Sequence, residues 1–186
     1  MSLTLYFGFQ TGGQIVYGME FLTVYPDYQC YEGGEWITCD RQTDICDAGL
    51  SADLWRIDYE SENSFRNWVD PDKLNLTCVP GYMIGLMGSA YFLGFAISSG
   101  ITPTIGDRYG RKKPYTISLF VQTCAYALII SSKDIRATIG SYFLVGLCAG
   151  GRDVIGAMYQ AEFMPEKYHV IAMTGVNCVD ATAMIF

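Results

Sequence analysis

The chain has little positive charge and almost no histidine. Of its 186 residues, one is histidine, 12 are lysine or arginine and 19 are aspartate or glutamate, so the formal net charge is −7. No basic face is long enough to follow a phosphate backbone, which excludes nucleic acid as an expected partner. A nucleophile elbow, a phosphate-binding loop and a cluster of metal ligands are also missing from the sequence. We therefore expect no enzyme activity, no cofactor and no metal site.

Long apolar stretches are the main feature that is present. Hydrophobic residues make up 51% of the chain, and the mean hydropathy of +0.19 indicates apolar spans together with one sizeable polar insert. About 20 mostly apolar residues cross a bilayer as a helix. Five windows predict transmembrane helices, over residues 1–25, 80–105, 115–132, 137–161 and 170–186. Because the last window is still apolar at the end of the sequence, we expect a truncated helix there and a chain that is a fragment.

The polar insert, residues 26–79, is acidic and rich in cysteine. It carries twelve acidic and four basic residues, a net charge of −8, and four of the seven cysteines of the chain. These are Cys30, Cys39, Cys46 and Cys78. An even number of cysteines in a polar segment indicates two disulfides in an oxidising compartment, and the sequence leaves all three pairings open. Zinc is the alternative, but the spacings match no common zinc pattern.

Two further features predict how the chain crosses the membrane. Asn75-Leu76-Thr77 is a glycosylation sequon, which agrees with the cysteines in placing residues 26–79 outside the cytoplasm. Residues 106–114 form a short connection, and four of the twelve lysines and arginines lie within it. Since basic loops stay in the cytoplasm, we expect a multi-pass protein with its N-terminus inside, most simply in the plasma membrane.

The basic connection also carries a family signature. Residues 106–113 read G-D-R-Y-G-R-K-K, which resembles the loop between helices 2 and 3 of the major facilitator superfamily of secondary transporters. Weaker motifs resemble its organic cation and organic ion transporter branch: Gly8-Phe9-Gln10 with Pro26-x-x-x-Cys30, Leu76-Thr77-Cys78, and Glu162-x-x-Pro165. The resemblance implies an all-α membrane protein. It would be a partial N-terminal helical bundle of about five transmembrane helices with a cysteine-containing extracytoplasmic loop.

The resemblance implies a function as well. Transporters of this family move solutes by alternating access, so we expect transport of an organic cation, an organic anion or a sugar-like solute. Transporters of this family resemble one another in having twelve helices arranged in two halves. The implied partners are therefore the lipid bilayer, the small organic solute and the remaining half of the transporter. A non-transporting truncated membrane protein or an accessory membrane subunit is the alternative, because the chain is short.

A conformational latch is expected at the cytoplasmic end of the bundle. Its candidate residues are Asp107, Arg108, Gly110, Arg111 and Glu162. The arginines can reach carboxylates or helix C-termini there, and such contacts would favour one state of a rocking cycle. In the alternative interpretation, Arg111, Lys112 and Lys113 only anchor the loop at the lipid surface.

The charge pattern departs from that of the family at three positions. Pro103 stands where glycine is usual, Tyr142 where arginine is frequent, and His169 where the last arginine of the E-x-x-P-x-x-x-R element is expected. These departures predict an altered charge network.

Polar side chains inside the expected helices are candidates for a solute or ion path. They are Gln10, Gln14, Arg152 and Asp180. The two glutamines lie four residues apart and so share one helical face. A charged group inside a membrane helix usually faces the bundle or a cavity. For the arginine, the alternative to a role in transport is a structural ion pair with Asp153, Asp107 or Glu162.

Overall fold

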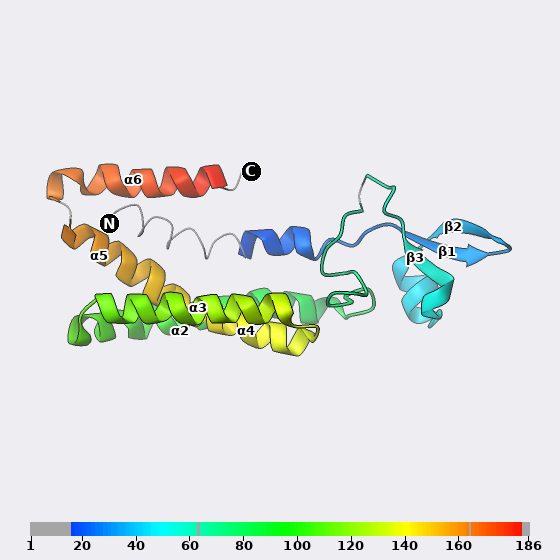
Figure 1. Ribbon diagram of the computed structural model, residues 1–186, viewed down its shortest axis with the longest axis horizontal. Helices are drawn as coiled ribbons and strands as arrows, with labels where there is room; N and C mark the ends of the chain where they lie inside the picture. The colour runs from blue at the N-terminus through cyan, green and yellow to red at the C-terminus, as the bar shows by residue number, and fades with distance from the viewer. Residues whose placement is uncertain (1–15, 63, 164, 184–186) are drawn as a thin grey trace. The chain divides into compact units, whose positions relative to one another are not determined.

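The computed structural model describes residues 16–62, 64–163 and 165–183 (Figure 1). The chain divides into two compact units. One is Met19–Ile84, called the loop module below, and the other is a helical unit of Met1–Gly18 and Gly85–Phe186. Within the expected first membrane helix, residues 16–22 are helical, and residues 1–15 lie outside the described part.

The loop module is built on a small antiparallel sheet. Its strands are β1 (Tyr28–Glu32), β2 (Glu35–Cys39) and β3 (Trp55–Ile57), in the order β2-β1-β3. Gly33 and Gly34 connect β1 to β2 with φ values of 62° and 98°, a backbone conformation that glycine adopts without a steric cost. The expected all-α class therefore describes the helical unit but not this segment.

Two turns of helix connect β2 to β3. They are the π-helical turn η1 (Arg41–Asp47) and the 3-10 turn η2 (Ala52–Leu54). Asp40 caps η1, because its Oδ2 accepts hydrogen bonds from the backbone N of Gln42 and of Thr43, each at 3.0 Å. The backbone hydrogen bond from Thr43 is the main reason why the pKa of the Asp40 carboxyl is lowered.

Two disulfides and an apolar core hold the module together. Cys30 pairs with Cys39 across the hairpin, and Cys46 of η1 pairs with Cys78, so the four cysteines expected to form disulfides do so. The buried apolar residues of the module are Tyr28, Cys30, Ile45, Ile57, Val69, Leu74 and Leu76. A segment with such a small core depends on its cross-links for stability.

Polar contacts join the two ends of the module. Asn67 is buried, and its Nδ2 donates a hydrogen bond to the backbone oxygen of Val24 at 2.7 Å. Arg41 Nη1 donates to the backbone oxygen of Thr77 at 2.7 Å, and its guanidinium carbon lies 3.9 Å from the centroid of the Tyr25 ring. Arg41 therefore bridges the segment that enters the module and the segment that leaves it.

Breaking the Cys46–Cys78 disulfide is expected to destabilise the module more than breaking Cys30–Cys39. The sequence separations are 32 and 9, and the loop-closure model makes the longer loop worth about 1 kcal/mol more. Limited proteolysis of the two double Cys→Ser variants measures the difference, with the intact protein as reference. Equal cleavage rates in the two variants would contradict this ranking.

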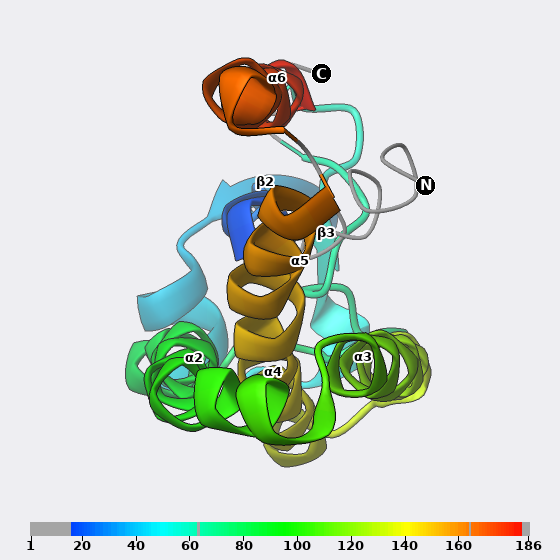
Figure 2. The same cartoon turned by 90° about the vertical axis from the view of Figure 1, so that its left-hand side faces the viewer.

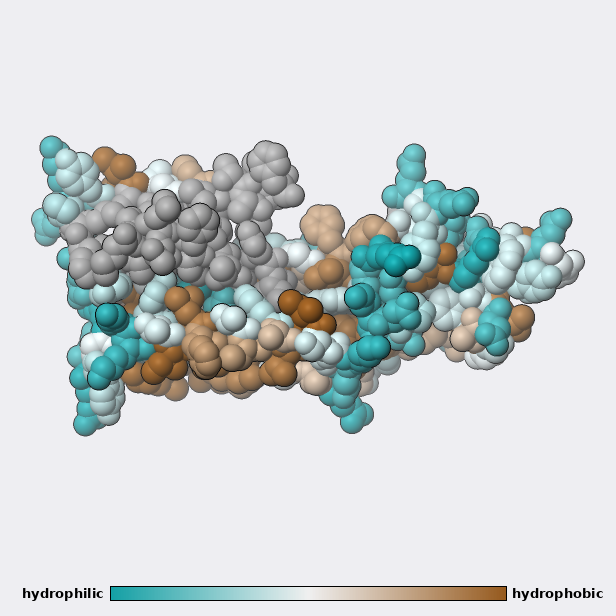
Figure 3. All heavy atoms as spheres, viewed as in Figure 1, coloured by the Kyte–Doolittle hydropathy of each residue, from teal (hydrophilic) through white to brown (hydrophobic). Residues whose placement is uncertain are grey.

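The helical unit is built on long apolar helices. The helical elements are α2 (Gly81–Tyr109), α3 (Lys112–Ser131), α4 (Ile135–Ala149), the π-helical turn η3 (Gly150–Val154), α5 (Ile155–Phe163) and α6 (Glu166–Ala183). Figures 1 and 2 show α2, α3 and α4 running side by side. Within the described residues, α2 and α3 are long and apolar enough to span a membrane, and only 22% of each apolar window is buried. Figure 3 shows apolar side chains gathered along these helices.

The helix ends differ from the expected ones in two places. α2 continues to Tyr109 and α3 begins at Lys112, so the expected connection over 106–114 is reduced to Gly110 and Arg111. Gly110 has a φ of 82°, the left-handed conformation that commonly ends a helix. The expected fourth helix, over 137–161, is divided into α4 and α5 by η3.

Two glycines allow α2 and α4 to pack backbone against backbone. A Cβ added at Gly94 of α2 would overlap the Phe143 carbonyl of α4, and one added at Gly146 of α4 would overlap the Tyr91 carbonyl of α2. No side chain fits between the helices at this crossing. This packing therefore requires glycine at both positions, and small residues are common where membrane helices cross.

Candidate functional site

Three of the five expected latch residues meet at one end of the helical unit. Asp107 lies in the last turn of α2, Arg111 follows in the connection to α3, and Glu162 lies in the last turn of α5. Arg111 Nη2 is 3.6 Å from Asp107 Oδ1, and Arg111 Nε is 3.0 Å from Glu162 Oε1. One guanidinium therefore links α2 to α5, through two carboxylates that are more than fifty residues apart in the sequence.

Glycine shapes the backbone around this ion-pair cluster. Gly110 reverses the chain directly after α2, which brings Arg111 back towards Asp107. A Cβ at Gly106 would lie 3.0 Å from Ile155 Cδ1, so α2 also contacts the beginning of α5 closely here. The cluster borders a pocket of about 540 Å³.

The other basic residues of the connection do not join the cluster. The Arg108 guanidinium carbon lies 5.7 Å from the centroid of the Tyr109 ring, and among the described residues Arg108 makes no ion pair. Lys112 and Lys113 line the pocket without an ion pair within the described part of the chain. This arrangement fits the anchoring interpretation for the lysines. The structure brings together Asp107, Arg111 and Glu162 of the expected latch.

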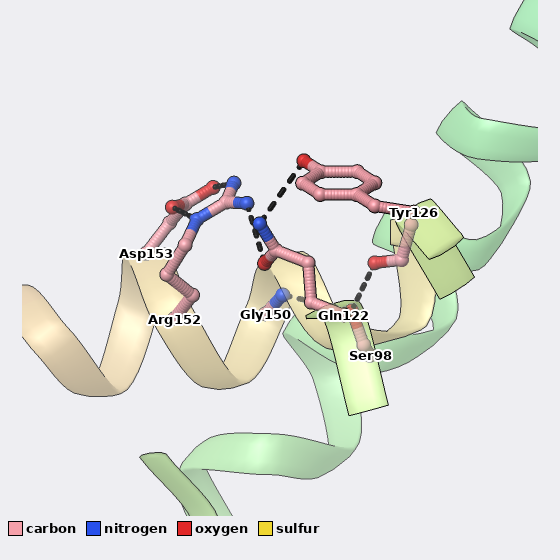
Figure 4. Close-up of polar contacts among 7 residues, drawn as sticks. Ser98, Gln122, Tyr126, Gly150, Arg152 and Asp153 are labelled. Carbon is pink, nitrogen blue, oxygen red and sulfur yellow. Dashed lines mark hydrogen bonds and ion pairs between the residues drawn. The ribbon is translucent and has the colours of Figure 1, made fainter. Parts of the chain in front are cut away.

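A second polar cluster lies inside the helical unit, around Arg152 of η3. The side chain is only 2% exposed. Its Nε and Nη2 donate to Asp153 Oδ1 and Oδ2 at 2.6 and 2.8 Å, and its Nη1 donates to Gln122 Oε1 at 2.9 Å (Figure 4). Gln122 Nε2 in turn donates to the Tyr126 hydroxyl at 3.0 Å. The buried guanidinium is thus neutralised by a bidentate carboxylate and held by an amide of α3.

Two consecutive glycines explain why Arg152 reaches α3. A Cβ at Gly150 would overlap the side chain of Ser98 on α2, and one at Gly151 would overlap the side chain of Ser118 on α3. Ser98 Oγ also accepts a hydrogen bond from Gly150 N at 3.2 Å (Figure 4). The π-helical turn therefore lies against both neighbouring helices, and π-helical turns often mark functional positions.

The remaining candidates of the predicted path have different outcomes. Gln10 and Gln14 lie outside the described residues. Asp180 belongs to α6, and its side chain also lies outside the described part. Arg152 is found with Asp153, which was one of the three structural partners considered for it. Gln122 was missed by the sequence analysis, although a glutamine inside an uncharged membrane window is a usable signal of an internal contact.

Comparison with known proteins identifies relatives of the chain. A model of the Major Facilitator Superfamily matches residues 72–186. The inner membrane metabolite transport protein YgcS of Escherichia coli is 30% identical over 98 residues, which cover 53% of this chain and 22% of YgcS. The human organic cation/carnitine transporter 2 is 27% identical over 105 residues, or 56% of this chain and 19% of the relative.

A further relative gives a similar match. Solute carrier family 22 member 2 of Rattus norvegicus is 27% identical over 96 residues, which cover 52% of this chain and 17% of the relative. In these three comparisons the chain spans about a fifth of the length of the relative. No solved structure gives a significant match.

Proposed function

The chain belongs to the major facilitator superfamily, and we propose that it forms the N-terminal part of a secondary transporter that moves a small organic solute by alternating access. The family consists of integral membrane transporters rather than enzymes. The proposed solute is an organic cation, an organic anion or a sugar-like molecule. The first class is supported by the name of one relative, the human organic cation/carnitine transporter 2.

The proposed topology has five membrane helices, completed by a second half that supplies the rest of the transport path. The loop module lies outside the cell in this arrangement, which its two disulfides support. The connection around Arg111 lies in the cytoplasm, which its four basic residues support. The plasma membrane is the proposed location.

The ion pairs of Arg111 are the observation that carries the proposal. They join α2 to α5 at the proposed cytoplasmic end, where a rocking bundle opens and closes. The carboxylate side chains are 69% and 53% exposed, so each pair is worth about 0–1 kcal/mol. Pairs of that strength bias an equilibrium between two conformations without locking it.

Uptake of labelled solutes tests the proposed function. The whole protein that contains these residues is reconstituted into lipid vesicles and offered labelled tetraethylammonium, benzoate and glucose as probes of the three solute classes. Saturable uptake of at least one probe above that of protein-free vesicles is expected. Uptake of all three at the level of protein-free vesicles would contradict the proposal and favour an accessory membrane subunit.

Neutralising the latch carboxylates is expected to slow transport while leaving folding and membrane insertion intact. Loss of about 1 kcal/mol changes a two-state equilibrium about fivefold, so Asp107→Asn and Glu162→Gln should each lower the uptake rate by up to about that factor. The larger effect is expected for Glu162→Gln, because its pair with Arg111 is the shorter one.

Lys113→Gln is the matched control for this comparison. It removes a charge from the same pocket but breaks no ion pair within the described residues. Initial uptake rates, normalised to the amount of protein in the vesicles, give the readout. Equal rates in the wild-type protein and the two carboxylate variants would exclude a latch at this site.

We also propose that the Arg152 cluster borders the solute path. An intramembrane charge usually faces a cavity or marks a path for a solute or ion. The bidentate contact with Asp153 neutralises Arg152, so the cluster has no net charge. The proposed solute therefore does not need a charge that compensates for Arg152. Asp180, Gln10 and Gln14 remain proposed members of the same path.

A further inference from the structure

We infer that a pocket on the loop module seats the first sugar of a glycan attached to Asn75. The inference rests on the proposed extracytoplasmic position of the module. The pocket has a volume of about 700 Å³, which is within the range of sites that hold small molecules. Trp55, Tyr59, Pro71 and Asn75 are among the residues that line it. The acceptor of the sequon and two aromatic rings thus share one cavity.

Asn75 is one of the residues that line this pocket. Its φ of 50° is the left-handed conformation, which asparagine tolerates better than most residues, and its backbone N donates to the Asp70 carbonyl at 3.1 Å. The residue is exposed, and within the described residues no hydrogen bond engages its side-chain amide. The amide nitrogen is therefore accessible for modification at the edge of the cavity.

The aromatic lining suits a pyranose ring. The C–H bonds of a sugar carry partial positive charge and pack favourably against the negative face of an aromatic ring. Trp55 is half-buried and is held in an edge contact with Tyr28, with ring centroids 5.8 Å apart. Tyr59 is 47% exposed. A sugar in the pocket would cover apolar surface of these two side chains that is otherwise in contact with water.

Polar groups in the same pocket can satisfy the hydroxyl and acetamide groups of the sugar. Arg56 Nε donates to Gln29 Oε1 at 2.9 Å, and Gln29 Nε2 donates to Asp58 Oδ2 at 2.9 Å. Asp58 Oδ1 also accepts from the backbone N of Glu60 at 3.1 Å. Glu60 and Asp72 line the pocket as well, so its lining is acidic overall and a free organic cation is the competing occupant that the experiment below distinguishes.

The covalent attachment delivers the sugar directly to the pocket. The Asn75 amide nitrogen forms a bond to C1 of N-acetylglucosamine, the bond from C1 to the lipid pyrophosphate of the donor breaks, and the amide gives up one proton. The lipid pyrophosphate leaves with the electron pair of the broken bond. Once attached, the sugar is present at the high effective concentration of a tethered ligand, typically millimolar for a short flexible tether.

Tryptophan quenching tests the inference, because all three tryptophans of the chain, at positions 36, 55 and 68, lie in the module. The protein with Trp36→Phe is produced with high-mannose glycans, and quenching by acrylamide is measured. One sample is untreated, a second is trimmed with endoglycosidase H to leave the first sugar, and a third is fully deglycosylated with peptide N-glycosidase F. The matched control carries Trp55→Phe in addition.

We expect the untreated and trimmed samples to be equally protected, and full deglycosylation to increase quenching in the Trp36→Phe protein but not in the control. Asn75→Asp reproduces the aspartate that peptide N-glycosidase F leaves behind, and it should match the fully deglycosylated sample. A glycan that is visible as a gel shift but leaves Trp55 quenching unchanged would overturn the inference.

Two other outcomes would also overturn the inference. The first is the absence of a gel shift on deglycosylation, because Asn75 would then carry no glycan. The second is protection of Trp55 by tetraethylammonium in the Asn75→Asp protein at concentrations that leave the control unaffected, because the pocket would then be a cation site. None of these measurements depends on transport, so a failure here is distinguishable from a failure of the proposed transport function.

Discussion

Gly146→Ala is expected to disrupt the packing of α2 against α4. The added methyl group would overlap the Tyr91 carbonyl and lie 3.1 Å from the backbone nitrogen of Phe95, and backbone atoms cannot rotate away as a side chain can. Overpacking of this kind typically costs about 1–3 kcal/mol and occasionally more. For a chain of this length the cost corresponds to a decrease in Tm of roughly 2–12 °C.

A second glycine on the same helix provides the control. A Cβ at Gly140 of α4 would have no neighbour within 4 Å, so Gly140→Ala adds the same methyl group to open space. Alanine is also the better helix former by about 1 kcal/mol, so this control should be neutral or slightly stabilising. Thermal unfolding of both variants in detergent, followed by the loss of monodisperse protein, measures the contrast. Equal Tm values for the two variants would show that α2 and α4 are not packed as described.

Arg152→Met is expected to have the second large effect. The substitution leaves Asp153 without its bidentate partner and removes the donor to Oε1 of Gln122, which is buried. Removing one member of a buried ion pair costs about 3–5 kcal/mol. Because the Asp153 side chain is 23% exposed, we expect a value near the lower end of that range and a marked loss of folded protein from the membrane fraction.

The double variant Arg152→Gln/Asp153→Asn tests whether the unpaired charge of Asp153 causes the loss of stability. It removes both charges but keeps side chains that can form hydrogen bonds, so most of the lost stability should return. Arg152→Lys should give an intermediate result, because a lysine keeps the charge but not the planar, two-pronged geometry. Yield of folded protein and Tm in detergent are the readouts. An Arg152→Met protein as stable as the wild type would refute the described network.

Local patterns in the sequence were enough to predict two of the long apolar helices. Uncharged windows of the required length correspond to α2 and α3, which are long and apolar enough to span a membrane. The helix end at Tyr109 was placed too early, because Asp107 and Arg108 are polar and nevertheless belong to the last turn of α2. Polar residues at a membrane boundary can belong either to the last turn of a helix or to the loop that follows. Composition alone therefore does not locate the end of a helix there.

The sheet of the loop module was missed although a local signal was present. Two stretches rich in aromatic and β-branched residues flank Gly33-Gly34, which is a recognisable hairpin pattern. The disulfide pairing, in contrast, had no local signal. Cys46 and Cys78 are brought together by the fold of the residues between them, and four cysteines allow three pairings on sequence grounds.

The contacts of the candidate sites depend on long-range packing. Only the family resemblance grouped Arg111 with Glu162 as parts of one expected latch. Their ion pair of 3.0 Å forms because α5 packs back towards the end of α2. Arg152 could be paired with its neighbour Asp153 from the sequence, but not with Gln122, which is thirty residues away on α3. The η3 turn, which orients the Arg152 side chain, was not predicted either. A helical pattern in the sequence does not reveal a π-helical interruption.

A counterflow experiment tests the proposed carrier mechanism most directly, because it requires no knowledge of the driving ion. Vesicles that contain the whole protein are loaded with the unlabelled form of whichever probe is taken up, and then diluted into a trace of the labelled form. A carrier with alternating access exchanges one molecule for another. Label is therefore expected to accumulate transiently inside the vesicles above its equilibrium level. A monotonic approach to equilibrium without overshoot would contradict alternating access, and no uptake above protein-free vesicles would contradict transport altogether.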